Sequence, residues 1–397
     1  MAYVLHMLSV FRFTSGLRPG SSVDNPTLIC VTAAAYLILM AGEINAFLYT
    51  SDGVYRFEIS YQFLCYVYVG GTQIISWYNR HSVIALCHRL ANRLPEFMGD
   101  AAAIETETTF KKIARSFGVG YWITMGLYVS APWINFLLQK FNYHDPKSYP
   151  MPFWFAALEI DSILKYLAIN VLQTIMCTMV FVVYSCSFSF IICVLINLKA
   201  HLKEIRRRTK ELTRSMKLLH DEKLRMIVNG ASKEEYQRYE SILVDEFVEI
   251  IRYKQVLYVY AKDAAEYLRW IFNAALVWCI MEIVMTTYMA TQIDADVVFK
   301  MKIMSVVTNV TGSFLLFCYV AETISHINEN CMEYFYDIPW YLDFIKIRKL
   351  LSMMLLQSQR MIEIKPFKMY TMNLILFSKS LKVIYSLLNF LLLVQRE

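Results

Sequence analysis

The sequence predicts an all-α membrane protein with seven transmembrane helices. Hydrophobic residues make up 57% of its 397 residues and charged residues 18%, whereas soluble globular chains average about 45–50% and about 25%. The hydrophobic residues are grouped into seven runs that approach or exceed the roughly 20 residues a transmembrane helix needs. The segments between these runs differ in basic content, and this difference predicts the orientation of the chain in the membrane.

The first three hydrophobic runs cover residues 27–49, 59–77 and 117–138. No cleavable signal peptide is expected, because Arg12 and Arg18 interrupt the apolar residues that precede the first run. We therefore expect the first span to act as an uncleaved signal. A polar segment between the second and third runs carries six Lys and Arg residues, namely Arg80, Arg89, Arg93, Lys111, Lys112 and Arg115.

The fourth run, residues 166–198, is longer than a bilayer requires, so its helix is expected to project beyond the membrane. The following residues 199–262 are the most charged part of the chain and are helical in character. Asn229-Gly230 predicts a break within them, because glycine after a helix favours termination. A second helix is expected from Lys233 directly into the fifth run. The last three runs lie at residues 270–290, within residues 297–321 and at residues 369–394.

The distribution of basic residues predicts a cytosolic N-terminus and an extracellular C-terminus. The loops after the second, fourth and sixth spans hold nearly all the basic residues, whereas the other three hold few, among them Arg56, Lys140, Lys147 and Lys300. Basic residues concentrate in cytoplasmic loops. This orientation is opposite to that of G-protein-coupled receptors, whose Asp-Arg-Tyr and Asn-Pro-x-x-Tyr signatures are also missing.

A short amphipathic helix is predicted before the last span. Asp337 and Pro339 indicate its start, as an acidic cap followed by proline in the first turn, and Pro366 indicates its end. Apolar residues recur on one face at three- and four-residue spacing, namely Ile347, Leu350, Leu351, Met354, Leu355 and Met361. We expect this helix to lie below the bilayer, with its apolar face packed on the charged extensions of the fourth and fifth spans.

The last span carries a polar stripe. On a helical wheel the residues of this stripe are Thr371, Ser378, Lys382, Tyr385, Ser386 and Asn389. The opposite side is apolar and consists of Phe377, Ile384, Leu388 and Leu391. Polar groups in hydrocarbon are costly unless they face protein or water. The stripe therefore indicates either a helix–helix contact or a water-lined path, and Lys382 favours the path. One helix cannot enclose a pore, whereas several copies around an axis can.

The C-terminal segment resembles the C-terminal signature of insect odorant receptors. The similarity rests on four stretches, which are Tyr336-Asp337 with Trp340-Tyr341, Leu-Leu-Gln-Ser-Gln-Arg at residues 355–360, residues 373–377, and Leu-Lys-Val-Ile-Tyr-Ser at residues 381–386. Upstream, the likeness is one of topology and span placement and extends over the whole chain.

This resemblance implies a ligand-gated, non-selective cation channel that assembles as a tetramer with the odorant receptor co-receptor. The ligand would be a small volatile organic molecule, aromatic ones included, and neither a G protein nor nucleic acid would be needed. The charged loop between the fourth and fifth spans is shorter than that of the co-receptor, which implies an odorant-tuning subunit. The expected location is the plasma membrane of a sensory neuron dendrite.

The resemblance also divides the chain into three parts. Residues 1–335 would form a six-helix transmembrane bundle with the odorant pocket in its outer half and the cytosolic extensions at residues 199–262. Residues 336–366 would form a cytosolic anchor through which subunits meet, with contacts from Trp340, Tyr341, Leu350 and Met354. Residues 367–397 would form the pore-lining helix.

The family's hydrophobic gate aligns with Leu392, with Leu391 and Leu393 as alternatives in register. On the helical wheel Leu392 shares a face with Asn389 and Tyr385, and Ser386 lies beside them along the expected pore. A ring of leucines blocks ions by dewetting. The alternative is that these leucines face lipid.

Polar, aromatic and flexible apolar residues in the outer halves of the spans are the candidates for the odorant pocket. The candidates are Phe63, Tyr66, Met125, Tyr128, Trp133, Ile169, Gln173, Tyr288, Met304 and Val307, with Asn170, Val284, Ile303 and Thr308 beside them. Such side chains suit loose recognition of a small volatile molecule, although each also suits ordinary packing. Glu43 and Glu282 lie inside spans, where they mark an ion or ligand path or pair with Lys165, Lys300 or Lys302.

Enzymatic activity is not expected, because no HExxH, GxSxG, P-loop or paired Cys/His motif is present. The nine cysteines predict neither a disulfide framework nor a metal site, and no catalytic residue or cofactor is predicted. Two alternatives remain open: a homotetrameric channel of the related gustatory receptor type, and a carrier that uses the buried carboxylates. A carrier should show internal repeats, and the sequence shows none.

Overall fold

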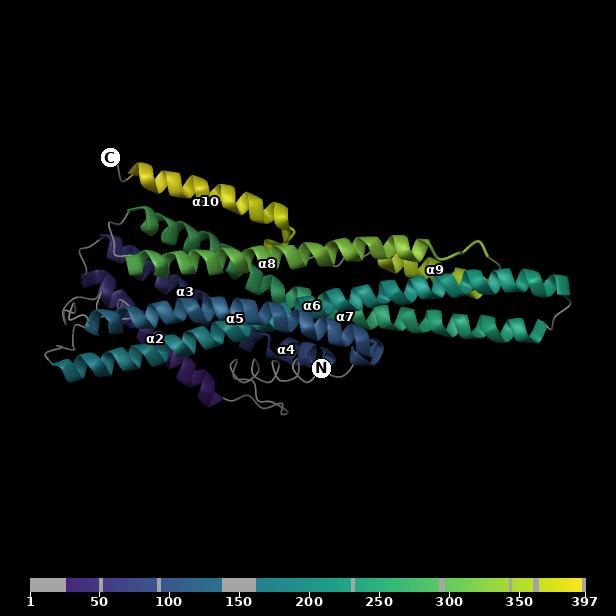
Figure 1. Ribbon diagram of the computed structural model, residues 1–397, viewed down its shortest axis with the longest axis horizontal. Coiled ribbons are helices and arrows are strands. Elements are labelled where there is room, and N and C mark those ends of the chain that lie inside the picture. Colours follow the sequence, from purple (N-terminus) through teal and green to yellow (C-terminus); the bar gives the residue numbers. More distant parts are fainter. Residues whose placement is uncertain are drawn as a thin grey trace.

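The computed structural model (Figure 1) describes residues 26–49, 53–90, 94–137, 162–229, 233–292, 297–342, 345–359 and 364–394. Within these ranges the chain consists of helices and short turns, with no strand. Most of the helices run roughly along one common axis (Figure 1). The all-helical architecture predicted from the sequence is therefore confirmed.

The first three predicted spans each correspond to one helix. The elements of this part of the chain are α2 (Pro26–Tyr49), α3 (Gly53–Tyr78), α4 (Arg80–His88), the 3-10 turn η2 (Pro95–Phe97) and α5 (Asp100–Leu137). The helix of the third span begins well before the hydrophobic run, because the polar segment upstream continues it. The short α4 is amphipathic and buries Val83, Leu86 and Cys87 against the bundle.

Three helices are much longer than a bilayer is thick. They are α6 (Ile163–Asn229), α7 (Lys233–Gln292) and α8 (Val297–Tyr336), with 67, 60 and 40 residues. At 1.5 Å per residue, α6 spans roughly 100 Å. The far halves of α6 and α7 lie side by side and extend beyond the other helices (Figure 1). The projection of the fourth span and the break after Asn229 are thus confirmed, as is the uninterrupted helix from Lys233 into the fifth span.

Four helices in the described part of the chain are both long and apolar enough to cross a membrane, namely α6, α7, α8 and α10 (Leu374–Val394). Residues Ala33–Tyr49 of α2 form a shorter apolar stretch. The predicted spans at residues 27–49, 59–77, 166–198 and 270–290 lie wholly within single helices. Apolar residues from every one of the long helices contribute to one continuous core.

The projecting parts of α6 and α7 are joined by a buried polar cluster. The Tyr253 side chain is fully buried, and its hydroxyl lies 2.6 Å from Nδ1 of His201, which is itself only 2% exposed. The ring of Phe97 stacks on Tyr253, with centroids 4.8 Å apart. Arg208 donates to the Phe97 carbonyl over 2.8 Å and to Glu249 over 2.9 Å. These contacts connect α6, α7 and η2, so the projection is a rigid unit rather than two separate helices.

The amphipathic helix α9 (Ile345–Ser358) begins later than the sequence predicts. The backbone N–H of Asp337 donates to the Glu333 carbonyl over 2.9 Å, so Asp337 belongs to the last turn of α8 and is not a cap of α9. Residues 337–342 form a turn in which Ile338 is fully buried. The prediction that Asp337 and Pro339 start the helix is therefore wrong, because burial of Ile338 extends the packing of α8 past its end.

The predicted buried face of α9 is confirmed where the structure describes it. Ile347, Leu351 and Met354 are at most 2% exposed, and Leu350 packs against the same core. Met361 lies outside the described residues. The Lys254 ammonium group of α7 bonds the Ser358 hydroxyl and lies 4.4 Å from the centroid of the Phe335 ring. Charge and packing therefore hold α9 against α7 and α8.

The linker between α9 and α10 is sharply bent. Pro366–Lys368 form the 3-10 turn η4, in which Phe367 has φ 51°; Lys368 has φ 59°. Side chains other than glycine rarely adopt this left-handed region. The Phe367 N–H donates to Asn273 Oδ1 over 2.5 Å, which fixes the bend against α7.

The N-terminus of α10 is capped by two acceptors. Asn373 Oδ1 accepts the Leu376 N–H over 2.8 Å, and Glu322 Oε2 of α8 accepts the Leu374 N–H over 2.9 Å. A carboxylate at this end also complements the positive end of the helix dipole. The last helix therefore starts at Leu374 rather than at Met369, because residues before Asn373 are used in the bend and the cap.

The buried His201 makes the stability of the protein sensitive to pH. Burial lowers the pKa of His201 to about 4 from its ordinary 6.5, with Glu204 acting in the opposite direction. The folded chain therefore holds a neutral imidazole, whereas the unfolded chain takes up a proton near pH 6.5. The stabilisation is complete above that pH and is lost as the pH falls towards 4, at a cost of about 2 kcal/mol at pH 5.

Thermal unfolding of the purified protein between pH 7.5 and pH 5 tests this prediction. The melting temperature should fall more for the wild type than for the His201→Gln variant, which keeps a polar partner for Tyr253 without titrating. Burial raises the pKa of Glu204, but hydrogen bonds from Arg207 and Arg208 outweigh it and lower the pKa overall. Glu204 therefore acts at lower pH in both proteins. Equal pH dependence in the two proteins would contradict the assignment to His201.

Candidate functional site

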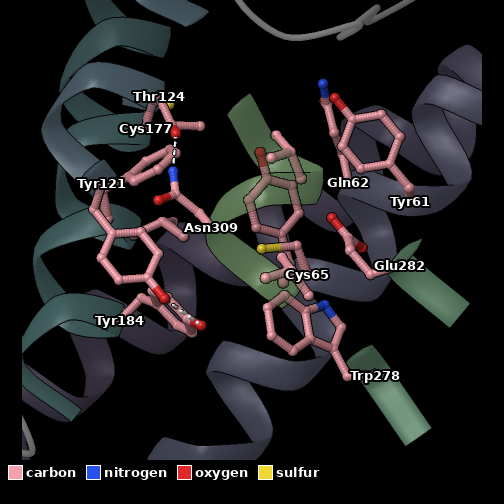
Figure 2. Close-up of a pocket in the computed structure, with 15 residues that line it drawn as sticks. Tyr61, Gln62, Cys65, Tyr121, Thr124, Cys177, Tyr184, Trp278, Glu282 and Asn309 are labelled. Carbon is pink, nitrogen blue, oxygen red and sulfur yellow. Dashed lines mark hydrogen bonds between the residues drawn. The ribbon is translucent and has the colours of Figure 1, made fainter. Parts of the chain in front are cut away.

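A cavity lies among α3, α5, α6, α7 and α8 (Figure 2). Its empty space is about 690 Å³, a volume that includes the open mouth of the cavity. The residues that line it are Tyr61, Gln62, Cys65, Tyr66, Tyr121, Thr124, Cys177, Val180, Phe181, Tyr184, Trp278, Glu282, Val306, Asn309 and Val310. Five separate helices supply these side chains, so the cavity exists only in the folded bundle.

Aromatic rings form a connected wall of the cavity. Trp278 stacks on Tyr68 of α3, with centroids 4.4 Å apart and an interplanar angle of 3°. The Tyr184 ring meets Trp278 edge-on at 5.7 Å and Tyr121 edge-on at 4.9 Å. The Tyr121 hydroxyl donates to the Tyr184 hydroxyl over 2.9 Å and lies 2.6 Å from Ser313 Oγ. Stacking and hydrogen bonds thus hold the rings in place before any ligand enters.

Helices α5 and α8 approach closely beside the cavity. The Asn309 amide of α8 donates to the Gly120 carbonyl over 3.0 Å and to the Thr124 hydroxyl. A Cβ atom on Gly120 would lie 2.5 Å from Asn309 Oδ1, which is closer than real Cβ contacts come. A side chain at position 120 would therefore force Asn309 to move from its position on the cavity wall.

Three side chains that line the cavity have a polar atom without a hydrogen-bond partner among the described residues, namely Gln62, Glu282 and, through its indole Nε1, Trp278. Gln62 is 5% exposed and Glu282 is 2% exposed. Both amide atoms of Gln62 and the Oε2 atom of Glu282 lack a hydrogen-bond partner among the described residues. Buried polar atoms are normally paired, and leaving one unpaired costs about 1–3 kcal/mol. The cavity therefore suits a molecule with an apolar body and at least one polar group.

The buried carboxylates outside the cavity do not have the partners that the sequence suggests. Lys302 of α8 pairs with Glu58 of α3 over 2.6 Å, in an ion pair that is almost fully buried. Glu58 is thus the partner of Lys302, in place of Glu43 or Glu282, the two carboxylates that the sequence suggests for it. Lys165 and Lys300 are exposed. Glu43 is fully buried in α2, and neither of its carboxyl oxygens has a hydrogen-bond partner in the described part of the chain.

The structure brings only part of the predicted pocket to this cavity. Tyr66 lines it, and Met125 lines a second cavity, between α5 and α6, that shares Tyr121 and Phe181 with the first. The Tyr128 side chain lies outside the described residues. Seven predicted residues, namely Phe63, Trp133, Ile169, Gln173, Tyr288, Met304 and Val307, are absent from both linings. Asn170, Val284, Ile303 and Thr308 are likewise absent.

Some of the residues that line the cavity could have been identified from the sequence, because polar and aromatic residues lie one helical turn apart within apolar runs. Glu282 stands out as a carboxylate within an apolar run, and Trp278 lies one helical turn before it. Gln62 and Tyr66 have the same spacing on α3, and together they indicate the faces of α3 and α7 that meet. Met304, by contrast, is 54% exposed, because the face of α8 on which it lies points away from the bundle.

The last helix packs on the bundle mainly by its apolar side, with Ser380 buried among the apolar residues. Leu376 and Ile384 are buried, and the Phe377 ring lies 5.4 Å from that of Phe314 in α8. The predicted polar stripe faces outward, since Ser378, Lys382, Tyr385 and Ser386 are exposed whereas Thr371, Asn389 and Leu392 are half-buried. Leu391 packs against the core and Leu393 is 62% exposed.

The predicted anchor residues divide between the interior and the surface. Met354 is buried and Leu350 is half-buried, whereas Trp340 and Tyr341 are 45% and 64% exposed. Ile345, Met353 and Leu356 add three more exposed apolar side chains to the outer surface of α9. This helix therefore has an apolar surface left over after its inner face has packed.

Comparisons with known proteins identify a family to which the sequence matches and solved structures with a similar fold. The model of the family described as 7tm Odorant receptor matches residues 73–385. The structure of the insect olfactory receptor OR5 from Machilis hrabei in complex with eugenol is similar, with TM-score 0.76 and 11% identity over 99% of this chain and 98% of that chain. The structure of the same receptor described without a ligand gives TM-score 0.71 at the same identity and coverage. A comparison with curated protein sequences finds no match.

The close approach at Gly120 gives a testable prediction. Gly120→Ala should destabilise the protein by about 1–3 kcal/mol, because the new methyl group displaces Asn309 from its hydrogen bonds. Gly126→Ala on the same helix is the control, since a Cβ atom there meets nothing within 4 Å. Alanine at position 126 should leave stability within about 1 kcal/mol of wild type, or raise it slightly through helix propensity. Thermal unfolding compares the two variants, and equal melting temperatures would contradict the close approach.

Proposed function

Because this chain belongs to the odorant receptor family, we propose that it is the odorant-tuning subunit of a ligand-gated, non-selective cation channel. Family membership makes it a multi-pass membrane receptor and not an enzyme. In the proposed mechanism a small volatile molecule enters the cavity among α3, α5, α6, α7 and α8. Binding there opens a pore that α10 lines together with the α10 helices of other subunits.

The cavity supports the ligand-binding part of this proposal. It is enclosed by five helices, and its walls are mainly aromatic and aliphatic, with a few polar groups. Such sites bind small molecules of largely apolar surface. A receptor of similar fold, the Machilis hrabei OR5, has been solved in complex with eugenol, which is a small organic molecule of this kind.

The exposed stripe of α10 is the observation that carries the channel proposal. Ser378, Lys382, Tyr385 and Ser386 face away from the bundle. In a single subunit they would face hydrocarbon, where unpaired polar and charged groups are costly. Copies of α10 around a central axis would place them against water instead. Leu392, at the outer end of the same face, is the proposed hydrophobic gate.

Helices α7 and α8 provide a path from the cavity to the pore helix. Both line the cavity, through Trp278 and Glu282 on α7 and through Val306, Asn309 and Val310 on α8. Both also pack against α10. Phe314, one turn beyond Val310, contacts Phe377 of α10. A ligand that shifts these walls would therefore bias the position of α10 without a separate mechanical element.

The apolar surface of α9 supports assembly into an oligomer. Trp340, Tyr341, Met353 and Leu356 are exposed together around this helix, and large exposed apolar side chains are typical of subunit interfaces. We propose that this anchor, residues 336–366, joins four subunits, with the odorant receptor co-receptor supplying the others. The N-terminus would be cytosolic and the C-terminus extracellular, in the plasma membrane of a sensory dendrite. The alternative is a homotetramer of the gustatory receptor type.

Expression with and without the co-receptor separates these assemblies. Under voltage clamp, a panel of volatile compounds should evoke cation currents only when the co-receptor is present. Current from the chain alone would favour the homotetramer, and the absence of ligand-evoked conductance with any partner would contradict the channel. The cavity-filling variant Val306→Phe should abolish the response, because it occupies the proposed ligand volume. Met304→Phe, on the exposed side of the same helix, is the control and should respond like the wild type.

The gate is tested by shortening three neighbouring leucines one at a time. Leu392→Ala should raise resting conductance or shift activation, because a smaller side chain weakens dewetting at the constriction. Leu391→Ala and Leu393→Ala should have smaller effects on gating, since Leu391 packs on the core and Leu393 lies off the helical face that Leu392 shares with Tyr385 and Asn389. Wild-type currents from Leu392→Ala, in an assembly shown to reach the membrane, would reject its gating role.

A further inference from the structure

Glu282 is the one acidic side chain among the residues that line the cavity, and Lys, Arg and His are absent from that lining. Its carboxyl group is 2% exposed, and Oε2 has no hydrogen-bond partner among the described residues. In Figure 2 this group extends into the space between the Tyr61 and Trp278 rings. An ionised carboxylate in an apolar environment is costly unless a cation compensates it. The cavity thus contains an acid whose ionised form a cationic ligand would stabilise.

The nearby basic side chains do not supply that counter-charge. Lys302 enters the same part of the bundle, but its ammonium group pairs with Glu58 over 2.6 Å. The two opposite charges of that pair, one on α3 and one on α8, neutralise each other. Lys165 and Lys300 are exposed rather than directed into the cavity. Within the described residues, the charge that would balance Glu282 is therefore left for a ligand to provide.

The aromatic rings that line the cavity would also favour a cation. Tyr61, Tyr66, Tyr121, Tyr184 and Trp278 all line the cavity. The face of an aromatic ring carries negative electrostatic potential and attracts ammonium groups, by up to about 2 kcal/mol or more where water is excluded. The hydroxyls of Tyr121 and Tyr184 are hydrogen-bonded to each other, so these rings are held in place. A carboxylate in a cavity lined by such rings is a site for a cation with an apolar substituent.

We propose that this cavity recognises volatile amines, in which one protonated nitrogen is attached to a small apolar body. The ammonium group would bind Glu282 Oε2, the rings would surround the charge, and the Gln62 carbonyl would accept a further N–H. Val180, Val306 and Val310 would contact the apolar body. This inference rests on the proposed odorant-receptor function and specifies its ligand class. An alcohol of the same shape would satisfy Oε2 by a hydrogen bond but would leave the carboxylate uncompensated.

Equilibrium binding to the full-length protein in lipid nanodiscs tests the ligand class directly. The probe is radiolabelled 2-phenylethylamine, with 2-phenylethanol and ethylbenzene as competitors that share its skeleton and differ in the terminal group. The wild type should bind the amine roughly 30-fold or more tightly than the alcohol, the lower end of the cost of removing one partner from a buried charged pair. An amine that binds no tighter than ethylbenzene would overturn the proposal, and this comparison needs no variant.

Two matched variants locate the effect. Glu282→Gln should weaken amine binding by a similar factor and change alcohol binding by no more than about 3-fold, because it removes the charge and keeps the shape. Glu43→Gln is the control, since Glu43 is equally buried and its oxygens are also without a partner among the described residues, but it does not line the cavity. Amine binding that is unchanged in Glu282→Gln, or lost equally in both variants, would overturn the assignment to Glu282.

Voltage-clamp recording with the co-receptor separates this proposal from the proposed function. Currents evoked by neutral volatiles, with no preferential amine binding, would reject the ligand class and leave the channel intact. Preferential amine binding that depends on Glu282, with no ligand-evoked current under any partner, would reject the channel and leave the ligand class intact. Both arms positive would assign amine detection to this receptor.

Discussion

The need to satisfy every polar group inside a hydrocarbon layer is the constraint on which this structure depends. Helices satisfy their own backbones, and the hydroxyl side chains of the spans bond back to the preceding turn: Ser76 to the Thr72 carbonyl, Thr178 to Thr174 and Thr286 to Glu282. Lys302 is satisfied by the buried Glu58. Some of the remaining polar groups, such as the carboxyl oxygens of Glu43, have no evident use, but two sets lie at places that the proposed function uses.

Two such places have different physical solutions. The outward stripe of α10 consists of groups that no part of the same chain covers, and water between subunits would satisfy them. The cavity contains a carboxylate and an amide that the chain encloses but does not pair, and a ligand would satisfy them. In both cases a helix bears polar residues at a cost in single-chain stability. The cost makes sense if the resting protein is an oligomer that awaits a ligand.

The long helices α7 and α8 connect these places mechanically. Each one lines the cavity in its membrane part and continues without interruption to the amphipathic α9. There Lys254 of α7 contacts both the Ser358 hydroxyl of α9 and the Phe335 ring of α8. The bend between α9 and α10 is fixed from both helices, by Asn273 to the Phe367 N–H and by Glu322 to the Leu374 N–H. Rigid elements that touch the ligand site, the anchor and the pore helix allow one displacement to reach all three.

The sequence by itself determined the helical class, the positions of the hydrophobic spans, the projection of α6 and α7, and the inner face of α9, because these follow from local hydrophobicity and three- to four-residue periodicity. It also showed the polar stripe of α10. Only the tertiary structure decided that α9 starts at Ile345, that Lys302 pairs with Glu58, and that Gln62, Trp278 and Glu282 share a cavity with Tyr66. Periodicity gives the faces of one helix, but the rotation of that helix against its neighbours is set by contacts between residues distant in the chain. The rotation of a helix therefore cannot be predicted from the residues of that helix alone.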